Sequence, residues 1–454
     1  MNKSIMGGLV VCWGLVGCAA GPDYHRPTVV MPVSYTGSAW SAAHPQDRVD
    51  RGNWWEVFHD AELNRLESLA MQSNTSLAVA VAQRDQAEAQ LRAADAGFWP
   101  SLSLTGQQTR NRSYLFSTAN HSAGLQATWE PDFWGAVRRA VEQQRDLLQA
   151  SDAQMASVRL SVAAQLAQAY FNVLTQVLRQ RLDDQNVKVY QDLLETTLHQ
   201  EAAGTVSQAA EVQVKSQLES AQAQAEQDRW QVEQLTHAVA VLCGQPVESF
   251  TLKLADDLPA LPSIPPGLPA TLLQRRPDIA NAERTMAAAN AAIGVAASAY
   301  FPTIDLAASV SFASNRWGSW LTAPYRYWSL GPSLTELLFD GGRRHALEDS
   351  AKASYRQAVA TYRGQVLTAL QEVEDNLSAL HGLQRQGQLT HASLQDAQQA
   401  WTITQNEYTA GTMAYPDVLN SELAMYSQQL ADLNVHSQQM SNTVLLIQAL
   451  GGGW

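Results

Sequence analysis

Few residues of this chain have types and spacings that could support catalysis. Its ten histidines are scattered, and no two of them stand four residues apart with a carboxylate between them, as in a common zinc motif. The chain also lacks a phosphate-binding glycine loop and the sharp turn that presents a nucleophilic serine. Close acidic pairs such as Glu372 and Glu374 are interpreted as solvated helix positions. We therefore expect no enzyme, no metal site and no bound cofactor.

One cysteine stands in a pattern that indicates a covalent modification. The chain begins Met1-Asn2-Lys3, continues with a short apolar run and reaches Leu15-Val16-Gly17-Cys18-Ala19. A basic start, an apolar segment too short for a permanent spanning helix and a small-residue cleavage site indicate an export signal. The last residues resemble the bacterial lipoprotein cleavage box, which implies that residues 1–17 are removed and that Cys18 becomes a lipid-carrying N-terminus. An ordinary signal peptide that contains a thiol is the alternative.

The composition limits the possible partners. Charged residues make up 16% of the chain and the net charge is −13. A phosphate-binding surface needs clustered Lys and Arg, so nucleic acid is not expected as a partner. Cys12 leaves with the signal and Cys18 would carry lipid, so Cys243 alone remains as a possible thiol and no disulfide framework exists.

Two long segments without a helix breaker set the fold class. Arg343 to Thr409 contains no proline, and its apolar residues recur at steps of three and four, the spacing of a coiled-coil seam. Val137 to Ala202 has the same character. At 1.5 Å per residue each helix would be about 100 Å long, several times the width of a small domain. The two segments predict long α-helical rods.

The chain is also internally duplicated. Phe98-Trp99-Pro100-Ser101-Leu102 corresponds to Tyr300-Phe301-Pro302-Thr303-Ile304, and Ala203-Gly204-Thr205 corresponds to Ala410-Gly411-Thr412. The repeat unit of about 200 residues is too long for a solenoid of short repeats and fits a duplicated half-protein.

Each repeat contains a stretch in which apolar and polar residues alternate with a period of two, as in a β-hairpin with one apolar face. Each strand has about ten residues, the length that a tilted strand needs to cross a bilayer. Aromatic residues stand at both ends of the strands, as at membrane interfaces. They are Phe98, Trp99, Phe133, Trp134, Tyr300, Phe301 and Phe339 at the helix end, and Tyr114, Phe116, Trp317, Trp320, Tyr325 and Trp328 at the loop end. A half-buried sandwich face is the alternative.

A membrane sheet must close on itself, because an open edge in hydrocarbon leaves backbone groups unpaired. The chain supplies four strands, whereas single-chain barrels need at least about eight. Several copies must therefore share one barrel. These residues alone set a multiple of four strands and leave the number of copies open.

The predicted organisation follows from these elements. The fold class is mainly α with a small membrane β part, internally duplicated. Residues 1–17 are the signal, 18–60 an extended arm, 61–244 the first repeat, 245–270 a proline-rich linker and 271–454 the second repeat. The hairpins are expected at about 101–132 and 303–338, and the long helices at about 137–202 and 343–409.

Several motifs in order carry a resemblance to a known family. They are the lipoprotein box, Gly21-Pro22-Asp23-Tyr24-His25-Arg26-Pro27, Trp54-Trp55, Arg275-Arg276-Pro277-Asp278-Ile279 and Phe339-Asp340-Gly341-Gly342. With the duplication, the sequence resembles bacterial outer-membrane efflux factors of the TolC-like family, in their NodT-type lipoprotein branch. The resemblance implies a homotrimer with a shared 12-stranded β-barrel in the outer membrane, continuous with a hollow coiled-coil barrel in the periplasm. It also implies a passive conduit for drugs or other toxic small molecules, met by a periplasmic adaptor protein and an inner-membrane pump.

The helix tips are the expected site of gating and partner contact. The turns at Gly204-Thr205 and Gly411-Thr412 join each long helix to its return helix, and glycine there permits the positive φ that reverses the chain. In the family, acidic residues just past the second tip form rings that constrict the pore. The match places Asp417 at one acidic position and Asn420 at another. Asp417 as a simple helix cap is an equally weighted alternative.

A second functional class also explains part of the sequence. A periplasmic coiled-coil lipoprotein, acting as an adaptor or scaffold, would account for the signal, the lipid site and the rods. Such a protein needs no strands that face lipid. The aromatic-bracketed hairpins and the duplication therefore favour the channel.

Overall fold

The computed structural model of the chain describes residues 20–26, 34–35, 38–39, 52–115, 117–262, 275–319 and 321–452. The chain forms two compact units, each assembled from three separate stretches. The first unit contains residues 1–30, 82–153 and 280–365, and the second contains 31–81, 154–279 and 366–454. The predicted signal and Cys18 lie outside the described residues. Within the described part, no helix combines the length and the apolar character needed to cross a membrane.

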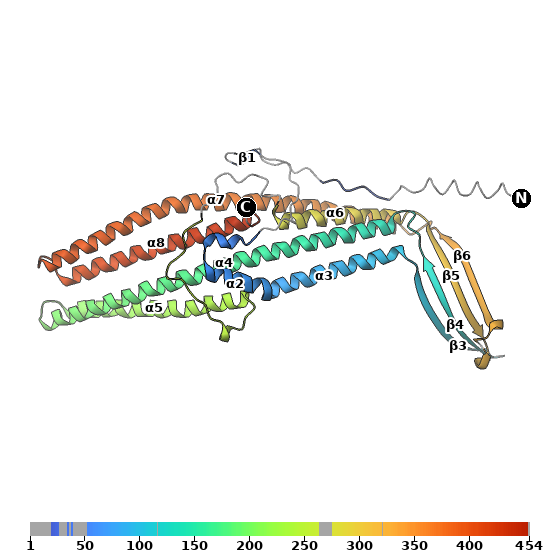
Figure 1. Cartoon of the computed structure of the whole chain (residues 1–454), viewed down its shortest axis with the longest axis horizontal. Helices are drawn as coiled ribbons and strands as arrows, with labels where there is room; N and C mark the ends of the chain where they lie inside the picture. The colour runs from blue at the N-terminus through green and yellow to red at the C-terminus, as the bar shows by residue number, and fades with distance from the viewer. Residues whose placement is uncertain are drawn as a thin grey trace. The chain divides into compact units, whose positions relative to one another are not determined.

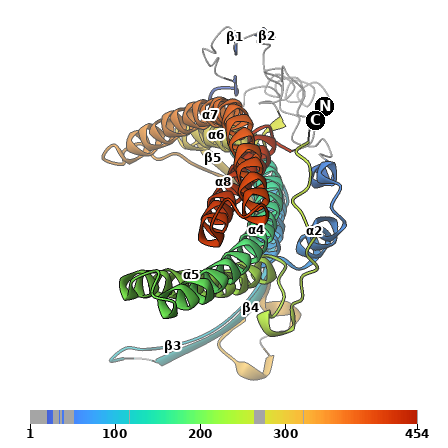
Figure 2. The same cartoon turned by 90° about the vertical axis from the view of Figure 1, so that its left-hand side faces the viewer.

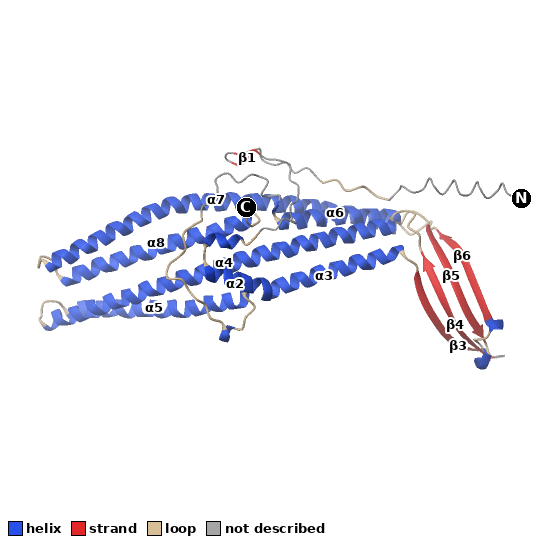
Figure 3. Cartoon of the chain, viewed as in Figure 1, coloured by secondary structure: helices blue, strands red, loops and turns tan. Residues whose placement is uncertain are grey.

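The first unit contains an antiparallel sheet of four strands in the order β3, β4, β5, β6 (Figure 3). Their bounds are Ser101–Arg112, Ser117–Trp129, Thr303–Ser314 and Arg326–Thr335. Two strands come from each predicted hairpin range, and the central pair β4 and β5 joins one repeat to the other. A separate pair of two-residue strands, β1 (Ser34–Tyr35) and β2 (Ser38–Ala39), lies in the arm, where no strand was predicted.

Two long helices, α4 (Ala136–Ala202) and α7 (Arg343–Thr409), contain 67 residues each. Each is followed by a return helix of 35 residues, α5 (Gln208–Leu242) or α8 (Tyr415–Ala449). Figures 1 and 2 show α5 lying alongside α4, and α8 alongside α7. The long helices have equal lengths in the two halves, and so do the return helices, as expected for a duplicated chain.

At the start of each long helix, a preceding aspartate accepts hydrogen bonds from backbone N–H groups. Asp132 accepts hydrogen bonds from the backbone N–H groups of Val137 and Arg138 at 3.0 Å. Asp340 accepts them from Gly342 and Arg344 at 2.9 and 3.0 Å. A carboxylate at a helix N-terminus pairs otherwise unsatisfied donors and complements the helix dipole.

The core of the second unit surrounds α2 (Ala61–Ser73). Asp60 is its N-cap and accepts from the backbone N–H groups of Glu62 and Leu63 at 2.9 Å. Asp60 also accepts a 2.7 Å hydrogen bond from the hydroxyl of Tyr170 on α4. Leu63 and Leu66 are fully buried in the same apolar cluster as Tyr170. Helix α2 is thus tied to α4 by one polar contact and by apolar packing.

Each repeat also has a helix that precedes its first strand, α3 (Thr75–Asp95) in the first and α6 (Pro277–Ser298) in the second. The second of these helices begins at Pro277, and residues 263–274 lie outside the described part. The Pro277 ring disfavours helical geometry at Arg276, whereas proline itself suits the first helical position.

One buried carboxyl makes the second unit sensitive to pH. Glu67 on α2 is fully buried, and neither of its carboxyl oxygens has a hydrogen-bond partner in the described chain. Burial raises its pKa from 4.5 to about 9, because an apolar environment disfavours the charged form. The folded chain keeps a proton that the unfolded chain releases. Glu67 therefore leaves the free energy of unfolding at its highest value below about pH 4.5. As the pH rises from there towards 9, the free energy of unfolding falls by about 1.4 kcal/mol per pH unit.

We predict that Glu67→Met raises the midpoint temperature of helix unfolding more at pH 8 than at pH 5, measured by circular dichroism. The matched control is Glu62→Gln on the same helix. Glu62 accepts from Arg65, which lowers the pKa of Glu62, so this control should instead lose stability at pH 8. Equal shifts for Glu67→Met at both pH values would contradict the buried neutral carboxyl.

Candidate functional site

The register of the sheet collects the apolar strand residues on one face. Leu104 lies opposite Leu125, Leu125 opposite Val310, and Val310 opposite Trp328, so one apolar row crosses all four strands. These side chains are exposed by 77, 44, 39 and 72%. A soluble sheet would bury such a row. Its exposure across every strand indicates a surface made to contact hydrocarbon or another chain.

The opposite face is polar and almost uncharged. The adjacent row consists of Ser103, Gln126, Ser309 and Ser329. The hydroxyls of Ser309 and Ser329 are hydrogen-bonded at 2.8 Å. Among the residues of the four strands that share this face, Asp305 is the single Asp, Glu, Lys or Arg. This face suits contact with water and offers little charge to select a solute.

The two outer strands of the sheet, β3 and β6, each pair on one side only within the described chain. Their other edges carry unpaired backbone donors and acceptors. Such edges are templates for pairing with another strand, and they cannot stand open in hydrocarbon. The combination of an exposed apolar face and two open edges requires further strands from outside this chain.

Aromatic side chains gather at the ends of the strands. Trp134 stacks on Phe301 with ring centroids 4.9 Å apart, and its Nε1 donates to the Pro302 carbonyl at 2.7 Å. Trp99 and Phe339, also at the helix end, are exposed by 74 and 86%. At the loop end, Tyr114, Trp317 and Trp328 are exposed, while Phe116 and Trp320 lie outside the described part. The predicted two-sided aromatic pattern is therefore present in the residues that the structure describes.

The two helix tips have the same closed geometry. Gly204 and Gly411 have φ values of 73° and 75°, in the left-handed region that favours glycine. The backbone N–H of Thr205 donates to the Gln200 carbonyl, and that of Thr412 donates to the Glu407 carbonyl, each at 2.9 Å. Both threonine hydroxyls donate to the same carbonyls. Each tip is thus a glycine-closed helix end reinforced by its threonine.

Asp417 and Asn420 lie on an exposed face of α8. The preceding Ala414 is the N-cap of this helix, with no side-chain cap, so the reading of Asp417 as the cap is wrong. Asp417 instead lies in the first turn, where a carboxylate also favours the helix dipole. Leu419, on another face, is buried against Val189 and Leu193 of α4. Packing against α4 therefore turns Asp417 and Asn420 away from the helix pair.

Arg276, whose partners the sequence did not reveal, organises a polar junction in the second unit. Its guanidinium is 7% exposed and donates to Asp278 and Glu372 at 2.6 Å each and to the Ala449 carbonyl at 2.9 Å. Glu372 is therefore an ion-pair partner, a contact that the sequence did not predict, although its side chain is still 45% exposed. A cavity of about 340 Å³ lies beside this junction. The Arg-Pro-Asp motif thus joins the start of α6 to α7 and α8.

Cys243 is buried, and burial raises its pKa to about 11. It is therefore poorly suited to react. Within the described residues, no group of three or more His, Cys, Asp or Glu side chains is arranged to hold a metal ion.

The fold and these surfaces define a class: a protein with a membrane-facing sheet and long coiled helices closed at glycine tips. The model of the outer membrane efflux protein family matches residues 66–245 and 268–452. The chain belongs to this family. It is an outer-membrane channel component of an efflux system.

Known proteins resemble the chain over nearly its whole length. The pyoverdine export outer membrane protein OpmQ of Pseudomonas aeruginosa is 33% identical, over 91% of this chain and 90% of that protein. The probable outer membrane lipoprotein SilC of Salmonella typhimurium is 27% identical, over 97% and 96%. The solved structure of the outer-membrane channel OprN superimposes with a TM-score of 0.83 and 28% identity, over 96% of this chain and all of that one.

Two neighbouring residues of β5 allow a test of the sheet faces. Val310 lies in the apolar row and Ser309 in the polar row. We predict that Val310→Arg sharply reduces the yield of membrane-inserted protein, because a lipid-facing Arg costs about 2–4 kcal/mol at the middle of a bilayer. The matched Ser309→Arg should insert normally. Membrane fractionation with heat-modified gel mobility measures both, and equal defects would show that the two faces are not lipid-facing and water-facing.

Proposed function

We propose that three copies of this chain form one closed sheet of 12 strands, with the apolar rows facing lipid and the polar rows facing a water-filled passage. The observation that carries the proposal is the four-stranded sheet with an exposed apolar face and two open edges. Pairing β6 of one copy with β3 of the next removes every open edge. The long helices of the copies then line a periplasmic tunnel. Such an assembly is a passive conduit and needs no catalytic residue.

The oligomer is tested by the mass of the detergent-solubilised complex, which should equal three chains and should remain trimeric on gels before heating. The shared sheet is the reason, because no single copy can pair its own edges. A folded monomer in detergent would contradict both the closed sheet and the conduit.

We further propose that Cys18 carries the lipid of an outer-membrane lipoprotein. The Leu-Val-Gly-Cys box supports this, and the relative SilC is named a probable outer membrane lipoprotein. The lipid would anchor the N-terminus in the inner leaflet, where it adds to the hold of the strands.

The tips at Gly204-Thr205 and Gly411-Thr412 are the proposed contact for a periplasmic adaptor, which would connect the channel to an inner-membrane pump. Both tips are exposed and share one geometry. An adaptor that grips both repeats would therefore meet two similar surfaces in each copy.

The exported solutes are proposed to be small molecules that the pump selects. The relative OpmQ is named for pyoverdine export. The polar face of the sheet, with Asp305 as its single charged residue, offers no specificity pocket. Because this polar face cannot distinguish one solute from another, the partner pump would select the exported solutes.

Asp417 is proposed to set the ion preference of the closed tip. If the copies converge there, their carboxylates form a ring that attracts cations in a narrow opening. Asp417→Asn should therefore reduce cation selectivity and block by divalent ions in planar bilayers, with the oligomer intact. Asn420→Ala is the uncharged control and should leave selectivity unchanged. An Asp417→Asn channel with normal selectivity and block would remove this residue from the pore.

A further inference from the structure

The segment that directly follows the predicted lipid site is docked on the first unit. The Ala20 N–H donates to the Trp134 carbonyl at 3.0 Å, next to the start of α4. Asn290 on α6 donates through Nδ2 to the Pro22 carbonyl at 3.0 Å. Residues 20–26 therefore bond to two different helical regions through their backbone. We call these residues the N-terminal clip.

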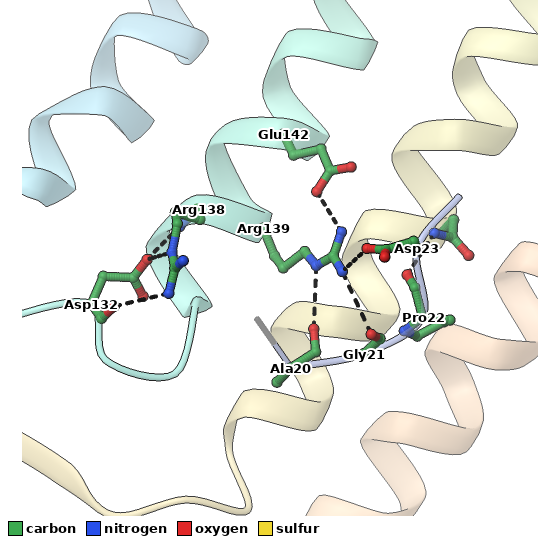
Figure 4. Close-up of polar contacts among 9 residues, drawn as sticks. Ala20, Gly21, Pro22, Asp23, Asp132, Arg138, Arg139 and Glu142 are labelled. Carbon is green, nitrogen blue, oxygen red and sulfur yellow. Dashed lines mark hydrogen bonds and ion pairs between the residues drawn. The ribbon is translucent and has the colours of Figure 1, made fainter. Parts of the chain in front are cut away.

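Arg139 of α4 holds the clip (Figure 4). Its side chain is 6% exposed, and its Nη2 donates to the Asp23 carboxylate at 2.7 Å. Its Nε donates to the Ala20 carbonyl at 3.2 Å, while Nη1 donates to Glu142 on the same helix at 2.7 Å. The planar guanidinium bonds to these separate acceptors through three different nitrogens, whereas the donors of a lysine all lie on one nitrogen.

The backbone of the clip packs closely against the backbone of α6, at Gly21 and Gly294. A Cβ added to Gly21 would overlap the Gly294 Cα on α6, and Gly21 has φ +89°. A Cβ added to Gly294 would lie 2.7 Å from the Ala20 carbonyl oxygen. Glycine is therefore required on both sides of this contact. The clip lies directly against the α6 backbone.

The far end of the clip is held by two tyrosine contacts. The Tyr24 hydroxyl donates to Glu283 of α6 at 2.8 Å. Arg26 donates to the Tyr362 hydroxyl of α7 at 2.8 Å and lies over its ring, 5.6 Å from the centroid. The clip is thus fixed along its length, and the Gly-Pro-Asp-Tyr motif supplies most of the contacts.

We propose that Arg139 is the positioning residue for the lipid anchor, holding the clip so that the lipid on Cys18 enters the membrane beside Trp134. The inference rests on the lipidation proposed above. Ala19 alone separates Cys18 from Ala20, and two residue steps span at most about 7 Å. With so little slack, a docked clip confines the anchor to the Trp134–Phe301 end of the strands.

The two repeats differ where the clip docks. Aligning Phe133 with Phe339 places Arg138 on Arg344, and each of these arginines bonds to the aspartate that caps its helix. The same alignment places Arg139 on His345. Similarly, Arg92 stands as far before Pro100 as Gly294 does before Pro302. The residues that accept the clip are thus specific to their repeat, whereas the capping arginines are shared.

The first experiment measures motion at residue 18. The full mature chain is produced behind a cleavable signal that lacks the lipoprotein box, and a nitroxide is attached to the free Cys18 thiol. Buried Cys243 does not compete for the label. We expect an immobilised spectrum for the wild type and a mobile spectrum for Arg139→Ala. Asp23 and Glu142 side chains are 82 and 39% exposed, so this change leaves no buried unpaired charge.

Arg138→Ala is the matched control, because Arg138 bonds to Asp132 and not to the clip (Figure 4). Its label should stay immobile. Gly294→Leu is the second variant and should free the label by filling the space of Gly21. Asp23→Ala combined with Arg139→Ala should add little to Arg139→Ala alone, since both remove one contact.

The second experiment uses the lipidated protein. Chymotrypsin cleaves after Tyr24 only when the clip undocks, and mass spectrometry detects the new N-terminus at His25. Loss of the charged contacts should raise the cleavage rate roughly tenfold or more in Arg139→Ala, with no rise in Arg138→Ala.

A wild-type label as mobile as that of Arg139→Ala would overturn the proposal. Equal release by Arg138→Ala would do the same, because the effect would then come from the start of α4. Oligomer mass and conductance are read on the same preparations. An immobile label in a protein without channel activity would support the clip and count against the proposed conduit, so the two failures are distinguishable.

Discussion

The constraint on which the structure depends is the pairing of backbone groups at the edges of the four-stranded sheet. In water an open edge bonds to solvent, but in hydrocarbon each unpaired group costs several kcal/mol. The apolar row from Leu104 to Trp328 commits the sheet to an apolar environment. The edges of β3 and β6 must then be paired by other copies. A shared barrel is therefore a consequence of strand number and face polarity together.

The duplication supplies the pattern for that pairing. Within one copy, β4 of the first repeat pairs antiparallel with β5 of the second. Pairing of β6 with β3 of the next copy repeats the same arrangement of one hairpin beside the next. Each copy thus contributes two hairpins, β3 with β4 and β5 with β6, to the shared barrel. The helix pairs follow the same logic, because α4 with α5 and α7 with α8 have matching lengths.

Sequence periodicity was sufficient to predict the helices and strands, but it could not predict the polar contacts between residues that lie far apart in the chain. Strand alternation and the proline-free runs predicted the two faces and the 67-residue α7 because they depend on local geometry. The Arg276 junction and the Arg139 clip join residues far apart in the chain, and no local pattern encodes such pairs. The prediction of Asp417 as a helix cap was wrong for a related reason. Backbone geometry at Ala414, and not the nearest polar residue, sets that helix end.

A comparison of the two repeats shows which residues the fold requires in both halves and which residues differ between them. Gly204 and Gly411 agree because each must reverse a helix at positive φ. Asp417, in contrast, aligns with Ala210 when the two tip glycines are superimposed. Helix α5 nevertheless has a carboxylate in its first turn, at Glu211, just as α8 has Asp417. An acidic first turn complements the helix dipole in both return helices, and the repeats differ by one residue in where that carboxylate stands.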